Sequence, residues 1–101
     1  MRQRLKLQRG SGNVFADVGF PAAEAQNLLL RAQLMLRIES HVREGELTQQ
    51  AAARRLGITQ PRLKQLLRHK IELFNLDALV SMLTKAGMRA ELRIKPIRKT
   101  A

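Results

Sequence analysis

Residues 47–68, LTQQAAARRLGITQPRLKQLLR, constrain the fold more than any other part of this chain. Thr48 and Thr59 each precede a run with helical spacing, where a hydroxyl can cap the first turn of a short helix. Between the two runs, Gly57 can adopt the positive φ of a sharp turn, and Ala53 is small where two helices would approach closely. The segment therefore predicts two short helices that cross at a tight turn, a helix-turn-helix.

The second of these helices has a polar and basic outer face. Leu63, Leu66 and Leu67 repeat at helical spacing and predict its buried side. The side chains left outside are Gln60, Arg62, Lys64, Gln65 and Arg68. Such a face alone is also typical of an ordinary solvated helix, but amide and cationic side chains at a helix N-terminus can contact adenine, guanine and phosphate in a DNA major groove. We assign these five residues to a DNA-binding surface, together with Thr59 and with Arg54 as a phosphate contact.

The charge distribution points to a polyanionic partner. The chain has 19 Lys and Arg against 8 Asp and Glu, a formal net charge of +11. A basic surface can also serve solubility alone, but here no acidic residue lies between Glu46 and Glu72. The cations within that interval are Arg54, Arg55, Arg62, Lys64, Arg68 and Lys70. Because the chain has three Phe and no Trp or Tyr, it offers few stacking platforms for single strands or RNA, and double-stranded DNA is favoured.

The residues before the motif predict a flexible basic arm over 1–13 and helix over 22–44. Residues 22–44 contain no helix breaker, so they form one long helix or two abutting ones. The apolar residues expected to face the motif are Leu30, Leu34, Ile38 and Val42. A second apolar face comprises Leu29, Ala32, Met35 and Leu36. This second face requires a cover, either from the chain's own termini or from another molecule.

The residues after the motif predict a further helix and a strand. Asn75 is a suitable N-cap, Asp77 suits the first turn, and Gly87 suits the C-terminal cap. The residues expected to face inward are Leu76, Leu79, Val80 and Leu83. From Met88 onward apolar and charged residues alternate up to position 95, which is typical of a half-buried strand. A lone strand leaves its backbone groups unpaired, so we expect it to pair with the N-terminal arm or with a second copy across a dimer axis.

The motif resembles the DNA-binding unit of the lambda repressor and Cro superfamily, the XRE family. The matching residues are Gln49, Ala53, Gly57, Ile58, Leu63 and Leu66. The flanks at 11–20, 74–83 and 86–94 look like those of HigA-type antitoxins. The resemblance implies a mainly α, Cro-like domain of four to five helices with a short C-terminal β-strand, in which Gln49 contacts a phosphate. We therefore expect one domain over 14–95, with the motif at 47–68 and a basic tail at 96–101.

By the same resemblance, the chain is expected to be a dimeric repressor that binds an operator palindrome in its own operon and neutralises a RelE-like ribonuclease toxin. Toxins of that type are usually basic, so a partner at +11 needs a locally acidic interface, for which Asp17, Glu24 and Glu39 are candidates. Two alternatives remain open. One is a stand-alone or phage-type repressor without a toxin, and the other is a basic RNA-associated protein.

The sequence offers no pattern for catalysis or metal binding. There is no cysteine, and neither His41 nor His69 has a metal-ligand spacing, although His69 suits a helix C-terminus or a phosphate. The acidic residues are scattered rather than paired, apart from Glu44 and Glu46 around a turn. We expect no enzymatic activity, no cofactor and no metal site. Because no apolar run approaches the ~20 residues that span a bilayer and no signal sequence is evident, a soluble, cytoplasmic protein is predicted.

Overall fold

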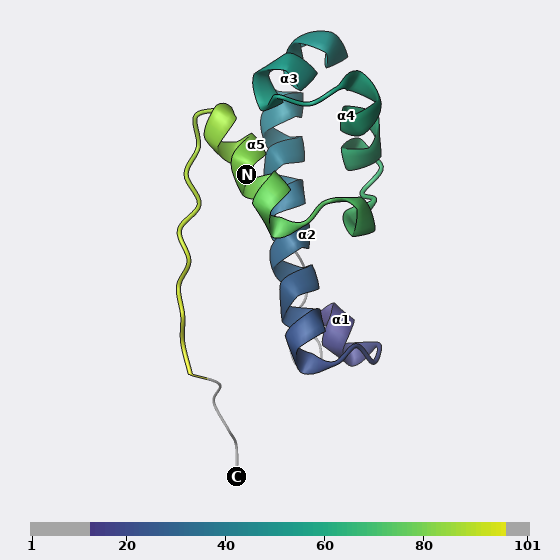
Figure 1. Cartoon of the computed structure of the whole chain (residues 1–101), viewed down its shortest axis with the longest axis vertical. Coiled ribbons are helices and arrows are strands. Elements are labelled where there is room, and N and C mark those ends of the chain that lie inside the picture. The colour runs from purple at the N-terminus through teal and green to yellow at the C-terminus, as the bar shows by residue number, and fades with distance from the viewer. Residues whose placement is uncertain (1–12, 97–101) are drawn as a thin grey trace.

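The computed structural model describes residues 13–96, and in this part the chain forms five α-helices and one 3₁₀ turn (Figure 1). The elements are α1 Val14–Asp17, α2 Ala22–Glu44, α3 Gln49–Leu56, α4 Gln60–Leu67, η1 Ile71–Leu73 and α5 Leu76–Lys85. The predicted mainly α class is confirmed. The predicted arm, except for Asn13, and the predicted tail after Pro96 lie outside the described residues.

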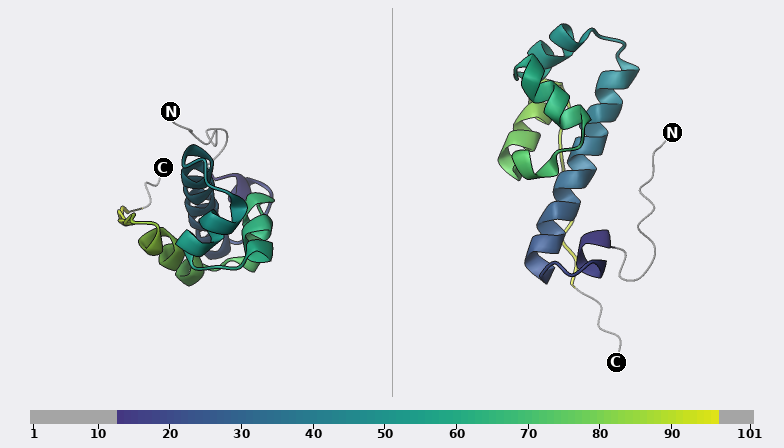
Figure 2. Two further views of the ribbon diagram at one scale, coloured as in Figure 1. Left: turned by 90° about the horizontal axis from the view of Figure 1, so that it is seen from above. Right: turned by 90° about the vertical axis from the view of Figure 1, so that its right-hand side faces the viewer.

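The long helix α2 is the element on which the others pack. It begins after Pro21, ends at Glu44 before the capping Gly45, and runs for 23 residues without a break, so one helix forms rather than two abutting ones. Figure 2 shows α1 at the N-terminal end of α2, whereas α3, α4 and α5 gather around its C-terminal half. None of the described helices is long and apolar enough to cross a bilayer.

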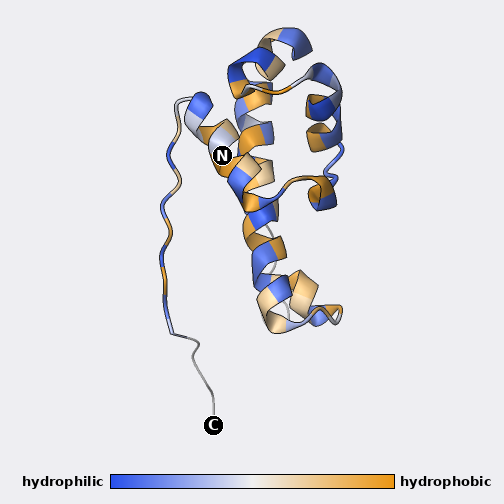
Figure 3. Cartoon of the chain, in the orientation of Figure 1, coloured by the Kyte–Doolittle hydropathy of each residue, from blue (hydrophilic) through white to orange (hydrophobic). Residues whose placement is uncertain are grey.

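The core lies between α2 and the helices α3 to α5, and Figure 3 shows hydrophobic segments where α4 and α5 face α2. Its buried residues are Met35, Ile38, Val42, Ala52, Ala53, Leu56, Leu63, Leu66, Phe74, Leu79, Met82 and Leu83. Met35, predicted on the second face of α2, is only 2% exposed, while Leu30 and Leu34 are half-buried. The reason is geometric: a row at four-residue spacing drifts around a helix, whereas a seven-residue step changes direction by only ~20°, so Met35 shares the direction of Val42. Val80, expected inward, is 42% exposed.

Residues 88–96 have no regular secondary structure and extend away from the helices (Figure 1). Met88 packs against the core, but all residues from 89 to 96 are exposed, including Leu92 at 69% and Ile94 at 84%. No strand is present within residues 13–96, so the predicted C-terminal strand is not confirmed. A strand requires a neighbouring strand, and the described part of a single chain provides none.

Candidate nucleic-acid interface

The predicted helix-turn-helix is present as α3, a short turn and α4. The Thr48 hydroxyl accepts a hydrogen bond from the Ala51 N–H at 3.1 Å, and the Thr59 hydroxyl accepts one from the Arg62 N–H at 3.2 Å. Gly57 ends α3 with φ +75°, in the left-handed region. Both predicted N-caps and the predicted turn residue are therefore confirmed. The local sequence sets where each helix begins and ends, which fixes where the side chains of α4 emerge.

The crossing of α3 with its neighbours depends on small residues. Ala52 and Ala53 are 1% and 3% exposed, and the Ile58 N–H donates to the Ala53 carbonyl oxygen at 2.9 Å. A Cβ added to Gly57 would lie 2.7 Å from Cδ of Lys85, at the end of α5. The nearby atoms belong to the flexible end of the Lys85 side chain, which can move aside. The positive φ of Gly57 is therefore the main steric reason for glycine at this turn.

Most of the predicted DNA-binding side chains lie on the outside of α3 and α4. The exposed ones are Gln49, Arg54, Thr59, Gln60, Lys64 and Arg68, whereas Arg62 and Gln65 are half-buried. Within residues 13–96, none of the cations Arg54, Lys64 and Arg68 forms an ion pair. Their charges are therefore not neutralised by nearby carboxylates in the described part of the chain. Unpaired cations beside a solvent-exposed helix are the side chains that a phosphate backbone can recruit.

Arg62 differs from its neighbours because its side chain turns toward the core. Its Cζ lies 4.2 Å from the centre of the Phe74 ring, and Phe74 itself is fully buried. The sequence pattern placed Arg62 on the outer face, but it occupies the flank of α4, where a planar guanidinium can cover an aromatic face. This arrangement is a cation–π contact between α4 and the segment that leads into α5.

Arg31 of α2, which no sequence motif marks, contacts the same segment. Its Nη1 donates hydrogen bonds to the carbonyl oxygens of Ile71 at 3.2 Å and Phe74 at 3.3 Å. Its Nε is buried and has no hydrogen-bond partner within residues 13–96. The available signal was a single charged residue inside the mostly apolar run LLLRAQLML. A charged residue there indicates a specific polar contact across the helix face.

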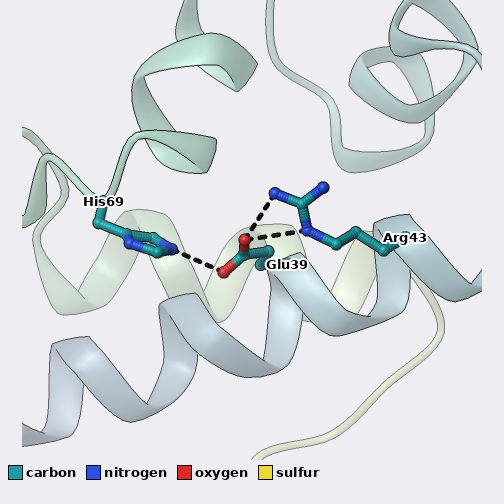
Figure 4. Close-up of polar contacts among 3 residues, drawn as sticks. All are labelled: Glu39, Arg43 and His69. Carbon is teal, nitrogen blue, oxygen red and sulfur yellow. Dashed lines mark hydrogen bonds and ion pairs between the residues drawn. The ribbon is translucent and has the colours of Figure 1, made fainter.

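A second set of polar contacts joins α2 to the end of α4 (Figure 4). Nε2 of His69 lies 2.7 Å from Oε1 of Glu39, and Arg43 donates to Oε2 of Glu39 through Nη2 at 2.8 Å and Nε at 3.0 Å. His69 follows α4 with φ +60°, and its N–H bonds to the Leu66 carbonyl oxygen at 2.9 Å. His69 therefore sits at the helix C-terminus as expected. Its ring contacts the carboxylate of Glu39, a partner that no local sequence pattern indicates.

The electrostatics of Glu39 follow from these contacts. Burial raises the pKa of Glu39, but the hydrogen bonds from His69 and Arg43, and their charges, outweigh this effect and hold the pKa below its ordinary value. The Glu39 side chain is 14% exposed, while Arg43 and His69 are 63% and 55% exposed. The carboxylate is thus shielded and its two partners are solvated. The cluster stabilises the junction of α2 and α4 in its ionised form.

Comparison with known proteins identifies the family to which this arrangement of helices belongs. A search of curated proteins finds no match to the chain. Residues 14–95 match a family described as a helix-turn-helix domain, and this match includes both α3 and α4 and the helices that support them. Such a domain indicates a DNA-binding regulator, with DNA as its partner. The chain belongs to this helix-turn-helix domain family.

Proposed function

We propose that the protein is a sequence-specific transcriptional regulator that binds double-stranded operator DNA as a homodimer through α4, which we call the recognition helix. The observation that carries this proposal is the face of α3 and α4, where cations that form no ion pair within residues 13–96 lie beside exposed glutamines. Cations supply affinity for phosphate, and amide side chains supply base discrimination. The proposal assigns the protein no catalytic step and no metal or cofactor.

Within this surface we assign different roles to different residues. Gln60 and Lys64 are the proposed base-contacting residues, since both are exposed on the outer side of the recognition helix. Gln65 lies on the flank and Thr59 at the helix start, where short polar contacts to bases or phosphate are within reach. The proposed phosphate contacts are Gln49, Arg54 and Arg68.

We further propose that the protein is an XRE-type regulator of the HigA branch, the antitoxin of a toxin–antitoxin pair that represses its own operon. The support is the resemblance of the motif and of its three flanking segments, 11–20, 74–83 and 86–94, which include α1 and most of α5. A RelE-like ribonuclease is then the expected protein partner. The alternative is a repressor without a toxin, which shares every DNA-binding feature. A short toxin-like reading frame beside the gene favours the antitoxin, and its absence favours the alternative.

The salt dependence of binding tests whether nucleic acid is the partner. The operator is first selected from a random duplex library, and its dissociation constant is measured at several salt concentrations. Phosphate neutralisation predicts a slope of log K against log salt of about −0.9 per contact, hence roughly −5 to −9 for a dimer that makes six to ten contacts. A slope near zero contradicts the proposal. The same titration with double-stranded RNA is the control, and tighter binding to RNA favours the RNA-associated alternative.

A further inference from the structure

Arg31 occupies a position where an arginine is energetically unfavourable unless it does something specific. It lies in the apolar part of α2, half-buried, with one buried nitrogen that finds no acceptor within residues 13–96. An unsatisfied buried donor lowers stability, and an apolar side chain of the same length would avoid that cost. The role of Arg31 therefore depends on the hydrogen bonds that its guanidinium does make.

Two successive contacts connect Arg31 to the recognition helix. Arg31 holds the carbonyl oxygens of Ile71 and Phe74, the two ends of the segment that contains η1. The ring of Phe74 in turn lies under the guanidinium of Arg62, in the first turn of α4. The next residue, Asn75, caps α5 by accepting the Ala78 N–H at 2.8 Å. Arg31 thus fixes a short segment against which the N-terminal turn of α4 is stacked.

We propose that Arg31 is a positioning residue for the recognition helix: through the backbone of Phe74 and its stacked Arg62, it sets the angle at which α4 enters the major groove. This inference rests on the proposed function. Arg31 itself is on α2 and lies outside the helix-turn-helix. It acts on operator selectivity without contacting DNA.

Selectivity is the property that such a role affects most. Hydrogen bonds to base edges depend steeply on distance and angle, so a small rotation of α4 removes them. Contacts between long cationic side chains and phosphate adapt to the same rotation, since the attraction is largely non-directional. Loss of the Arg31 contacts should therefore weaken operator binding more than binding to scrambled DNA.

The experiment compares Arg31→Met with Arg37→Met in the full chain. Methionine keeps the stem of Arg31 and removes its donors, and Arg37 is an exposed arginine on the same helix that makes no hydrogen bond within residues 13–96. For each variant, dissociation constants are measured for the selected operator and for a scrambled duplex of equal length. We expect Arg31→Met to lower the ratio of the two affinities roughly 5- to 160-fold, the size of a lost base contact, and Arg37→Met to leave it unchanged.

Arg31→Lys is the conservative variant, because the ammonium group can still donate to both carbonyl oxygens, and it should restore most of the ratio. A purely structural role of Arg31 predicts that the affinity ratio stays unchanged. A smaller folded fraction weakens binding to every sequence equally, so a lower melting temperature with an unchanged ratio overturns the inference.

If Arg31→Met does not fold, Phe74→Leu tests the next link, since it removes the aromatic face and keeps the site apolar. An unchanged ratio in Phe74→Leu overturns the inference, and a reduced ratio supports it. A wild-type protein that binds operator and scrambled DNA equally contradicts the proposed function itself and the inference with it. Failure of the proposed function, in which wild type shows no selectivity, is therefore distinguishable from failure of the inference, in which wild type is selective and the variants are too.

Discussion

Individual side chains on α4 and α3 are expected to contribute to DNA binding in two different ways. Gln60→Ala and Lys64→Ala should lower operator affinity more than affinity for scrambled DNA, because a base contact contributes ~1–3 kcal/mol of discrimination. Arg54→Ala should weaken both equally, as expected for a phosphate contact. Lys64 and Arg54 form a matched pair, since each substitution removes one exposed positive charge.

Titration of both duplexes with each variant distinguishes these roles. If all three variants weaken operator and scrambled DNA to the same extent, the outer face of α4 does not contact bases. In that case the protein binds duplex DNA through phosphate alone.

At the same scale, Glu39 should make stability depend on pH. A carboxyl whose pKa is lower in the folded than in the unfolded chain stabilises the fold above the unfolded pKa, and this stabilisation is lost as pH falls through the folded pKa. We expect Glu39→Gln to lower the free energy of unfolding at pH 7 by about 1 kcal/mol, because the partners of Glu39 are largely solvated. The difference from wild type should shrink as the pH falls below the ordinary pKa, near 4.5.

Urea unfolding at a series of pH values measures this effect. Glu44→Gln is the control, because it removes the same charge from the same helix at an exposed position where, within residues 13–96, only Ser40 donates to it. A constant difference between Glu39→Gln and wild type from pH 7 down to pH 3 would show that the ionised carboxylate is not what stabilises the junction.

At the scale of elements, the turn between α3 and α4 depends on backbone conformation. Gly57→Ala should destabilise the protein by about 1–2 kcal/mol, because its φ of +75° is unfavourable for any residue with a Cβ. The nearby Lys85 atoms belong to the end of a flexible side chain and can move aside. Gly87→Ala is the matched control, since Gly87 has φ +86° and open space around its Cβ position.

Thermal unfolding measures both variants. We expect similar losses in melting temperature, about 4–8 °C for each kcal/mol in a domain of this size. A much larger loss for Gly57→Ala would identify the Lys85 contact, rather than backbone strain, as the main reason for glycine. An unchanged melting temperature for Gly57→Ala would contradict the left-handed turn.

The helix ends could be predicted from the sequence, whereas contacts between helices could not. The caps Thr48, Thr59 and Asn75 were predictable because a cap and its helix are adjacent in the chain. The burial of Met35 was not, because the direction of one residue on a long helix depends on which face its neighbours cover. The contact of Arg62 with Phe74 and that of His69 with Glu39 join residues distant in sequence, and no local pattern encodes them.

At the scale of the whole molecule, the exposed segment 88–96 and the second face of α2 are two candidate interfaces for the proposed homodimer. An apolar groove where α1 and residues 69–71 meet that face is lined by Phe15, Ala32, Met35, Leu36, His69 and Ile71. The segment instead offers alternating apolar residues, of which Leu92 and Ile94 are largely exposed in the single chain. Pairing of two such segments would supply the missing neighbour for each strand and bring two recognition helices into one assembly.

We expect Leu92→Glu to convert the protein to a monomer and to weaken operator binding, because a charge replaces an apolar contact between paired segments. The fold of the single chain should be unaffected, since Leu92 is 69% exposed. Arg93→Gln is the matched control: it changes the net charge by the same amount on the opposite side of the segment and should leave the dimer intact. Sedimentation equilibrium measures both masses.

If Leu92→Glu remains dimeric and binds the operator as wild type does, segment 88–96 is not the interface. The groove on α2 then becomes the surface to test, and Leu36→Glu should dissociate the dimer instead.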